Sequence, residues 1–165
     1  MLRSIAPSGS PGGKASVGHN ISAEDTYPKK CRIRHFLGFT FTCGKSRRGA
    51  FQLQRKTRRD RMRAKLQEIK TELRQRMHQP IPSQGHWLKQ VVTGHFAYYA
   101  VPTNSRALSA FRHYVADLWR RTLRRRSQKD GFTWDRMTKL VADWLPAPRI
   151  LHPWPDRRFT VKHPR

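Results

Sequence analysis

Positive charge is the property of this sequence that most restricts its fold. The chain carries 35 Lys and Arg against 10 Asp and Glu, a formal net charge of +25 over 165 residues. Because such a charge repels itself in any compact state, the basic side chains have to point outward, and the fold has to rest on regularly spaced apolar residues. A field of this sign favours polyanions, so nucleic acid is the default partner.

Between residues 57 and 147 the apolar residues recur at helical spacing. They return at steps of three and four, which is typical of amphipathic helices with one buried face. Proline, asparagine or glycine separates the segments, so the pattern predicts three to four helices in a bundle. The expected buried faces hold Met62, Leu66, Ile69, Leu73 and Met77; Leu88, Val91, Val92, Phe96 and Tyr99; Leu108, Phe111, Val115, Leu118 and Trp119; and Trp134, Met137, Val141 and Trp144. The expected N-caps are Thr57, Ser83, Asn104 or Ser105, and Thr133.

Before the predicted helices, apolar residues recur at every second position. Residues 33–41 alternate along one run and residues 51–55 alternate again, which is typical of strands. Between them, the glycine-bracketed stretch CGKSRRG carries Lys45, Arg47 and Arg48. The pattern predicts a β-hairpin over residues 31–56 with a basic tip.

The two ends of the chain differ from its middle in composition. Residues 1–30 are rich in Gly, Ser and Pro and lack apolar periodicity, so we expect a disordered leader. Prolines also interrupt the other end, where we expect an extended basic tail over residues 148–165. The predicted fold class is therefore mainly α: a short N-terminal β-hairpin followed by a helical bundle over residues 57–147. We expect Cys31 and Cys43 to be free thiols.

No pattern in the sequence predicts catalysis or a bound cofactor. GKS at 44–46 lacks the upstream glycine of a phosphate-binding loop, and the cysteines and histidines do not show paired metal-ligand spacings. The only adjacent acids, Glu24 and Asp25, lie in the expected leader, which offers no rigid support for metal ions. No apolar run approaches the roughly 20 residues that cross a bilayer, so we expect a cytoplasmic protein without a membrane partner.

Three stretches resemble the bacterial group II intron reverse transcriptases, which also act as maturases. FLGF at 36–39, followed by a hairpin and a basic helix, resembles the last motif of the polymerase palm. Residues 63–127, which include GHFAYYAVP at 94–102, resemble the maturase-specific region, or domain X, which is the polymerase thumb. RILHPWPDRRF at 149–159 is similar to the C-terminal ends of members without an endonuclease domain.

The resemblance implies the C-terminal part of such an enzyme, with the end of the palm over residues 31–56 and an RNA-binding thumb over residues 57–147. The implied partners are structured group II intron RNA and an RNA/DNA primer-template, and the implied processes are RNA splicing and intron mobility. The implied RNA or primer contacts lie at the primer-grip turn, the hairpin tip, the start of the first helix and the end of the third. They are His35, Phe36, Leu37, Gly38, Lys45, Arg47, Arg48, Arg58, Arg59, Arg61, Arg63, Arg124, Arg125 and Arg126.

The departures from the family concern catalysis. The Tyr-x-Asp-Asp motif, whose carboxylates hold Mg²⁺ in the full-length family, is absent from the sequence, and so are the fingers and most of the palm. We therefore expect a truncated or rearranged copy without polymerase activity of its own. One alternative is a split RNA-directed DNA polymerase that works with fingers and palm in trans. Another is a DNA-binding helix-turn-helix formed by the third and fourth helices around SQKDGFT at 127–133.

Simpler interpretations stay open for several of these residues. Phe36 and Leu37 would equally suit packing between the hairpin and the bundle. Tyr98 and Tyr99 are more often core residues than platforms for stacked bases, and Asn104 is most simply a helix cap. The arginines at 124–126 would also suit a solvated helix end, since the helix C-terminus favours basic side chains.

Overall fold

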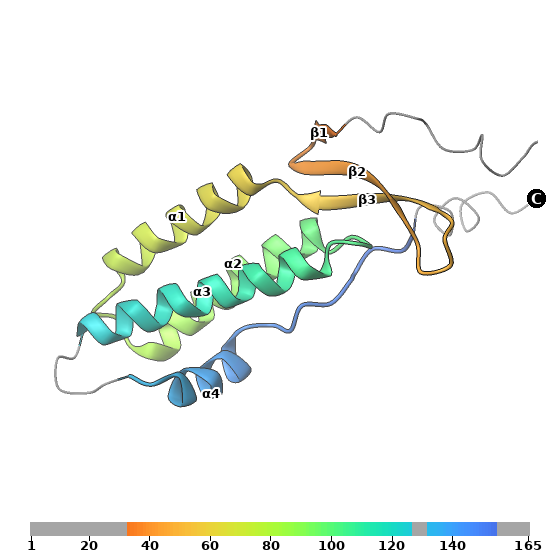
Figure 1. Cartoon of the computed structure of the whole chain (residues 1–165). Coiled ribbons are helices and arrows are strands. Elements are labelled where there is room, and N and C mark those ends of the chain that lie inside the picture. The colour runs from red at the N-terminus through yellow and green to blue at the C-terminus, as the bar shows by residue number, and fades with distance from the viewer. Residues whose placement is uncertain (1–32, 127–131, 155–165) are drawn as a thin grey trace, which may run out of the picture. The chain divides into compact units, whose positions relative to one another are not determined.

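The computed structural model describes residues 33–126 and 132–154, which form three strands followed by four helices (Figure 1). The expected leader over residues 1–30, the end of the expected tail, and most of the SQKDGFT turn lie outside the described residues. The elements are β1 (Arg34–Phe36), β2 (Phe39–Lys45), β3 (Phe51–Thr57), α1 (Arg59–Gln75), α2 (Ile81–Tyr99), α3 (Ser105–Arg126) and α4 (Trp134–Trp144). The predicted class, mainly helical with a small N-terminal antiparallel β-structure, is confirmed.

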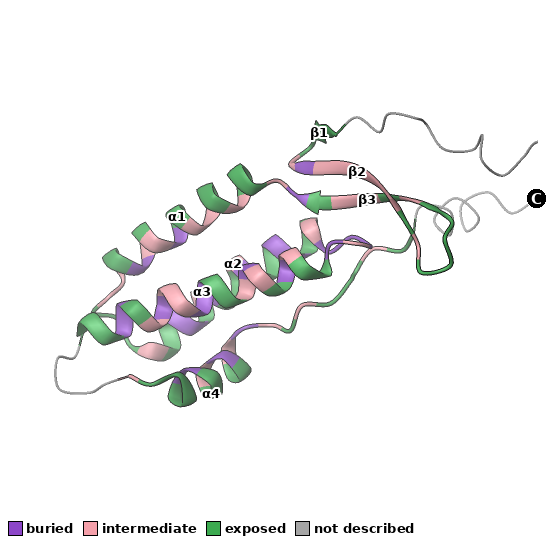
Figure 2. Cartoon of the chain, in the orientation of Figure 1, coloured by how far each residue is buried: buried purple, intermediate pink, exposed green. Residues whose placement is uncertain are grey.

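The helices enclose one apolar core. α1 packs against α3, and α4 packs against both α2 and α3, so that the buried residues of each helix face its neighbours (Figure 2). The predicted faces supply most of this core, because apolar residues three and four apart share one side of a helix. Fully buried members include Ile69, Leu73, Leu88, Val92, Leu108, Phe111, Val115, Trp119 and Met137. Trp134 departs from the prediction, since 41% of it is exposed.

A buried polar network ends α1 and joins it to α2 and α3. The Gln84 amide nitrogen donates to the carbonyl oxygens of Arg76, Met77 and Gln79, at 3.0, 3.3 and 3.1 Å. The Gln84 carbonyl accepts a 2.8 Å hydrogen bond from the indole of Trp119. Gln84 thereby satisfies backbone groups that the end of a helix leaves without an intrahelical partner.

The predicted hairpin is a three-stranded antiparallel sheet in the order β1-β2-β3. Residues 33–41 were expected to form one strand, and that prediction is wrong, because the chain reverses at Leu37 and Gly38. Both residues have positive φ, 46° and 77°, as a two-residue type I′ hairpin loop requires. The register pairs Phe36 with Phe39 on either side of this loop.

Two of the predicted N-caps are also wrong. α1 starts after Arg58 rather than after Thr57, and α2 starts after Pro80 rather than at Ser83. Pro82 lies in the first turn of α2. Proline suits this position, because its missing N–H would have no intrahelical acceptor there. Thr133 is the residue before α4, as predicted, although its side chain makes no capping hydrogen bond.

The segment after α4 returns to the end of α2. The backbone nitrogens of Leu151 and His152 donate to the carbonyl oxygen of Ala100, at 3.0 and 3.1 Å, and the His152 ring bonds to the Ala97 carbonyl at 2.7 Å. The first part of the expected tail is thus held against the bundle.

Cys43 of β2 is disulfide-bonded. The expectation of free thiols is therefore wrong.

None of the described helices is both long enough and apolar enough to pass through a bilayer.

Candidate nucleic-acid interface

The turn between β1 and β2 is anchored to two helices through its backbone. The Tyr98 hydroxyl of α2 donates to the Leu37 carbonyl at 2.8 Å, and the Arg58 N–H donates to the Gly38 carbonyl at 2.9 Å. A Cβ at Gly38 would lie 2.7 Å from the Tyr99 hydroxyl oxygen, and the φ of this residue is +77°, so glycine alone fits here.

The turn leaves its apolar side chains exposed. Phe36 is 63% and Leu37 65% exposed, so the interpretation that they pack between hairpin and bundle is wrong. Their backbone neighbour Phe39 is buried and packs on Tyr98 and Tyr99, with ring centroids 5.7 and 5.2 Å apart. The two tyrosines therefore hold the turn in place while Phe36 and Leu37 project from it.

Leu37 adopts a backbone conformation that leucine rarely takes. Its φ of 46° lies in the left-handed region, which costs a residue with a Cβ roughly 1–2 kcal/mol. Such outliers persist where the surrounding structure fixes them, and they cluster at functional sites. The neighbouring His35 is exposed, and its Nδ1 lies in hydrogen-bond contact with the Thr40 hydroxyl at 3.1 Å.

The connection between α2 and α3 fixes the outer edge of β3 with side chains. The Thr103 hydroxyl accepts from the Arg55 N–H at 2.8 Å and donates to the Arg55 carbonyl at 3.2 Å. Asn104, only 1% exposed, accepts from the Thr57 N–H at 3.0 Å and donates to the Thr57 hydroxyl and the Tyr99 carbonyl, both at 2.8 Å. These side chains take the place of a fourth strand. Asn104 is also the residue directly before α3, as predicted for an N-cap, and its carbonyl accepts the Leu108 N–H at 3.2 Å.

The same hydrogen bonds fix where α1 begins. Four arginines, which we call the α1 cluster, lie at the N-cap and in the first two turns: Arg58, Arg59, Arg61 and Arg63. Arg58 is half-buried and forms a double hydrogen bond with Asp60, at 3.0 and 2.6 Å. The other three members are exposed and form no ion pair within the described residues.

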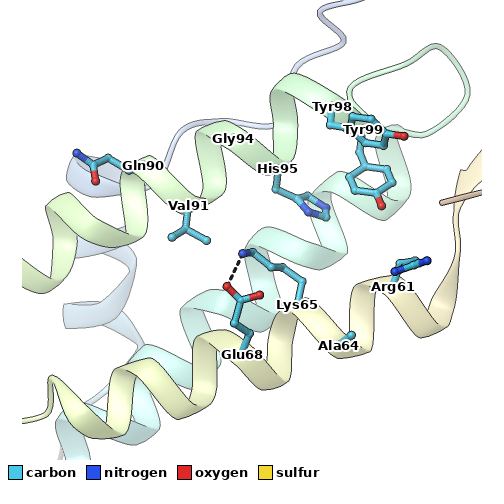
Figure 3. Close-up of a pocket in the computed structure, with 10 residues that line it drawn as sticks. All are labelled: Arg61, Ala64, Lys65, Glu68, Gln90, Val91, Gly94, His95, Tyr98 and Tyr99. Carbon is cyan, nitrogen blue, oxygen red and sulfur yellow. Dashed lines mark hydrogen bonds and ion pairs between the residues drawn. The ribbon is translucent and has the colours of Figure 1, made fainter. Parts of the chain in front are cut away.

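A groove of about 540 Å³ runs between α1 and α2 beside the anchored turn (Figure 3). Tyr98 and Tyr99, which hold the turn, also line the groove. On the α1 side, the Lys65 ammonium pairs with the Glu68 carboxylate at 2.7 Å. The lining residues are Arg61, Ala64, Lys65, Glu68, Gln90, Val91, Gly94, His95, Tyr98 and Tyr99.

His95 lies in the wall of this groove as a neutral ring. It is 8% exposed, and its ring stacks on Phe111 of α3 with centroids 3.7 Å apart. Burial, and then the charge of Lys65, lower the pKa of His95 to about 4. Its Nε2 is buried and finds no hydrogen-bond partner among the residues that the structure describes.

The remaining predicted contacts lie elsewhere. Arg124, Arg125 and Arg126, the α3 cluster, are exposed in the last turn of α3, and the Arg126 guanidinium donates to the Gln79 carbonyl at 3.0 Å. α3 begins next to Asn104, and a helix of 22 residues spans about 33 Å, so the α3 cluster lies a helix length from the anchored turn.

The basic hairpin tip is also separate. Lys45, Arg47 and Arg48 lie where β2 turns into β3, opposite the strand ends that carry Phe39 and Thr57. Seven-residue strands extend over about 23 Å. Of the predicted contacts, the structure therefore brings together only the β1–β2 turn and the α1 cluster.

The groove and its lining residues Gly94 and His95 were not predicted from the sequence. A glycine inside an otherwise helical pattern was the available signal, because such a glycine usually has a packing or functional reason. Within residues 33–126 and 132–154, no group of three His, Cys, Asp or Glu side chains is placed to hold a metal ion.

Comparison with known proteins identifies no relative: no family model, no curated protein and no solved structure matches this chain.

Proposed function

We propose that this chain binds structured RNA in the manner of the C-terminal part of a bacterial group II intron reverse transcriptase/maturase. The proposed partner is intron RNA or an RNA/DNA primer-template in the bacterial cytoplasm, and the proposed role is in splicing or intron mobility. We propose binding without a cofactor and without polymerase activity, since the sequence has no Tyr-x-Asp-Asp carboxylates.

The observation that carries the proposal is the position of the α1 cluster beside the anchored turn. The Arg58 N–H bonds to the Gly38 carbonyl, so the turn and the cluster adjoin. The turn offers exposed apolar side chains, which suit contact with unpaired bases. The cluster offers exposed guanidinium groups, which suit phosphates.

The placement of the α1 cluster is otherwise unfavourable. The N-terminus of a helix carries a partial positive charge, so basic side chains there reduce helix stability. Asp60 is the one acidic residue of the first turn and is already paired with Arg58. A bound polyanion would relieve this repulsion, which is why we assign the phosphate contacts to Arg59, Arg61 and Arg63.

Filter binding of the full chain to a structured RNA tests the proposal. If three or four phosphates are neutralised, the slope of log K against log salt is about −3 to −4. An affinity that hardly changes with salt would contradict the proposal. Primer extension by the purified chain is expected to yield no cDNA, and measurable synthesis would overturn the non-catalytic role.

A further inference from the structure

Gly94 of α2 has no steric reason to be glycine. A Cβ built on it meets no atom within 4 Å, whereas a Cβ at Gly85 of the same helix would lie 2.5 Å from the Trp144 ring. Glycine in a helix interior lowers helix stability relative to alanine. Packing explains Gly85 but not Gly94, and the open space at Gly94 lets another molecule approach the helix backbone closely.

Gly94 lines the α1–α2 groove next to a second unexplained feature, the His95 side chain (Figure 3). Figure 3 shows the His95 ring turned toward the Lys65 side chain across the groove. The residue is 92% buried, and its Nε2 has no hydrogen-bond partner among the described residues. Buried polar atoms are nearly always hydrogen-bonded, and one that is not calls for an explanation.

The polar groups across the groove are mixed in character. Glu68 contributes a carboxylate, which accepts hydrogen bonds and repels phosphate. Its partner Lys65 donates, at 2.7 Å, and the exposed amide of Gln90 both donates and accepts. Such a set is poorly suited to phosphates but suits hydroxyl groups, which also donate and accept.

One of the proposed phosphate contacts also belongs to the groove. Arg61 lines it from the α1 cluster, and no ion pair occupies this guanidinium within the described part of the chain. A strand whose phosphates contact Arg61 would have its sugars, which adjoin the phosphates, next to the groove. In RNA those sugars carry the 2′-hydroxyl, the group that distinguishes RNA from DNA at a given site.

We propose that the α1–α2 groove receives the ribose edge of an RNA strand, with Gly94 as the point of closest approach and Glu68 and Gln90 as partners of 2′-hydroxyl groups. This inference rests on the proposed RNA-binding function and adds that the groove selects RNA over DNA.

Replacement of Gly94 tests the approach. Gly94→Gln should weaken binding of an RNA hairpin about tenfold or more, because the new side chain occupies the place of a ribose. Binding of the DNA hairpin of the same sequence should change less than twofold. Thr93→Gln is the matched control, because Thr93 is exposed on the same helix and does not line the groove; it should leave both affinities within twofold. The melting temperature of Gly94→Gln should equal or exceed that of the wild type, which excludes unfolding as the cause.

Glu68→Gln separates a ribose site from a phosphate site. We expect the ratio of RNA to DNA affinity to fall about threefold or more, since a strong acceptor of hydroxyl protons is lost. Equal tightening of both ligands would instead show that Glu68 repels phosphates, and would overturn the proposal. If Gly94→Gln bound RNA with wild-type affinity and kept the steep salt dependence, the proposed ribose site in the groove would be overturned, while the proposed RNA-binding function would stand. Failure of the wild-type chain to bind RNA at all would overturn the proposed function itself.

Discussion

The α1 cluster and the α3 cluster contain similar numbers of arginines but lie at opposite kinds of helix end. The α3 cluster lies in a last turn, where the partial negative charge of the helix favours cations, so helix stability alone accounts for it. The α1 cluster begins at the residue before α1, and Arg59 and Arg61 lie in the first turn, where the same effect opposes cations. Because arginines at this position lower the stability of their own helix, the α1 cluster is the better candidate for an anion site.

The surroundings of the two clusters differ as well. The α1 cluster adjoins the anchored turn and a groove with a glycine that packing does not explain. The α3 cluster adjoins the α1–α2 connection, to which Arg126 bonds. Equal charge density in a sequence therefore does not imply equal function, because helix polarity and neighbouring surfaces decide what each cluster can bind.

The largest effect is expected when each cluster is neutralised in turn. Arg59→Gln/Arg61→Gln/Arg63→Gln should lower RNA affinity about 100-fold, at roughly 1 kcal/mol for each charged contact. Arg124→Gln/Arg125→Gln/Arg126→Gln removes the same charge and should lower affinity only about threefold, through the general field. Filter binding at matched salt measures both, and equal losses would remove the distinction between the clusters.

A second effect concerns how firmly each cluster is positioned. Asn104→Ala leaves the Thr57 N–H and the Tyr99 carbonyl without their partners, and should lower the free energy of unfolding by about 2–3 kcal/mol. Arg126→Gln removes an exposed hydrogen bond and should change it by less than about 0.5 kcal/mol. Urea denaturation followed by circular dichroism compares them. An Asn104→Ala protein as stable as the wild type would show that the start of α1 is not fixed by this network.

The groove beside the α1 cluster should also make folding depend on pH. Because the pKa of His95 is lowered to about 4, the unfolded chain binds the proton more readily than the folded chain below pH of about 6.5. Stability should therefore be constant above that pH and fall by on the order of 2 kcal/mol as pH decreases toward 4. His95→Phe, which keeps an aromatic ring on Phe111, should flatten this part of the curve. The urea midpoints of both proteins are measured between pH of about 4 and 6.5. If the midpoint changed with pH equally in the wild type and in His95→Phe, the effect would be refuted.

The smallest effect is expected at the turn. Leu37→Asn gives the Asn-Gly pair that type I′ turns prefer and should raise the free energy of unfolding by about 1 kcal/mol. The same change removes an exposed apolar side chain and should weaken RNA binding severalfold. A gain in stability with unchanged affinity would mean that the leucine does not contact RNA.

The sequence predicted the helices well and the turn poorly. Helical spacing identified buried residues such as Leu73, Val92 and Phe111 because the period of 3.6 is a local property. The alternation through residues 33–41 concealed the reversal at Leu37, since leucine rarely adopts a positive φ.

The contacts that assemble the candidate site could not be predicted, because they join distant parts of the chain. Asn104 and Thr57 are 47 residues apart and Tyr98 and Leu37 are 61 apart, and no local pattern records such pairs. The sequence also gave no means of ranking the α1 cluster above the α3 cluster. That ranking depends on which end of a helix each occupies and on what lies beside it.

The most direct measurement is the change in backbone amide NMR signals of the full chain as a structured RNA is added. We expect the largest shifts in three segments: residues 35–38, 58–65 and 90–99. These are the turn, the start of α1 and the groove side of α2. Residues 120–126 should shift little. Shifts centred on residues 120–126, or shifts of equal size throughout the described chain, would contradict the assignment of the RNA-binding face to the α1 cluster.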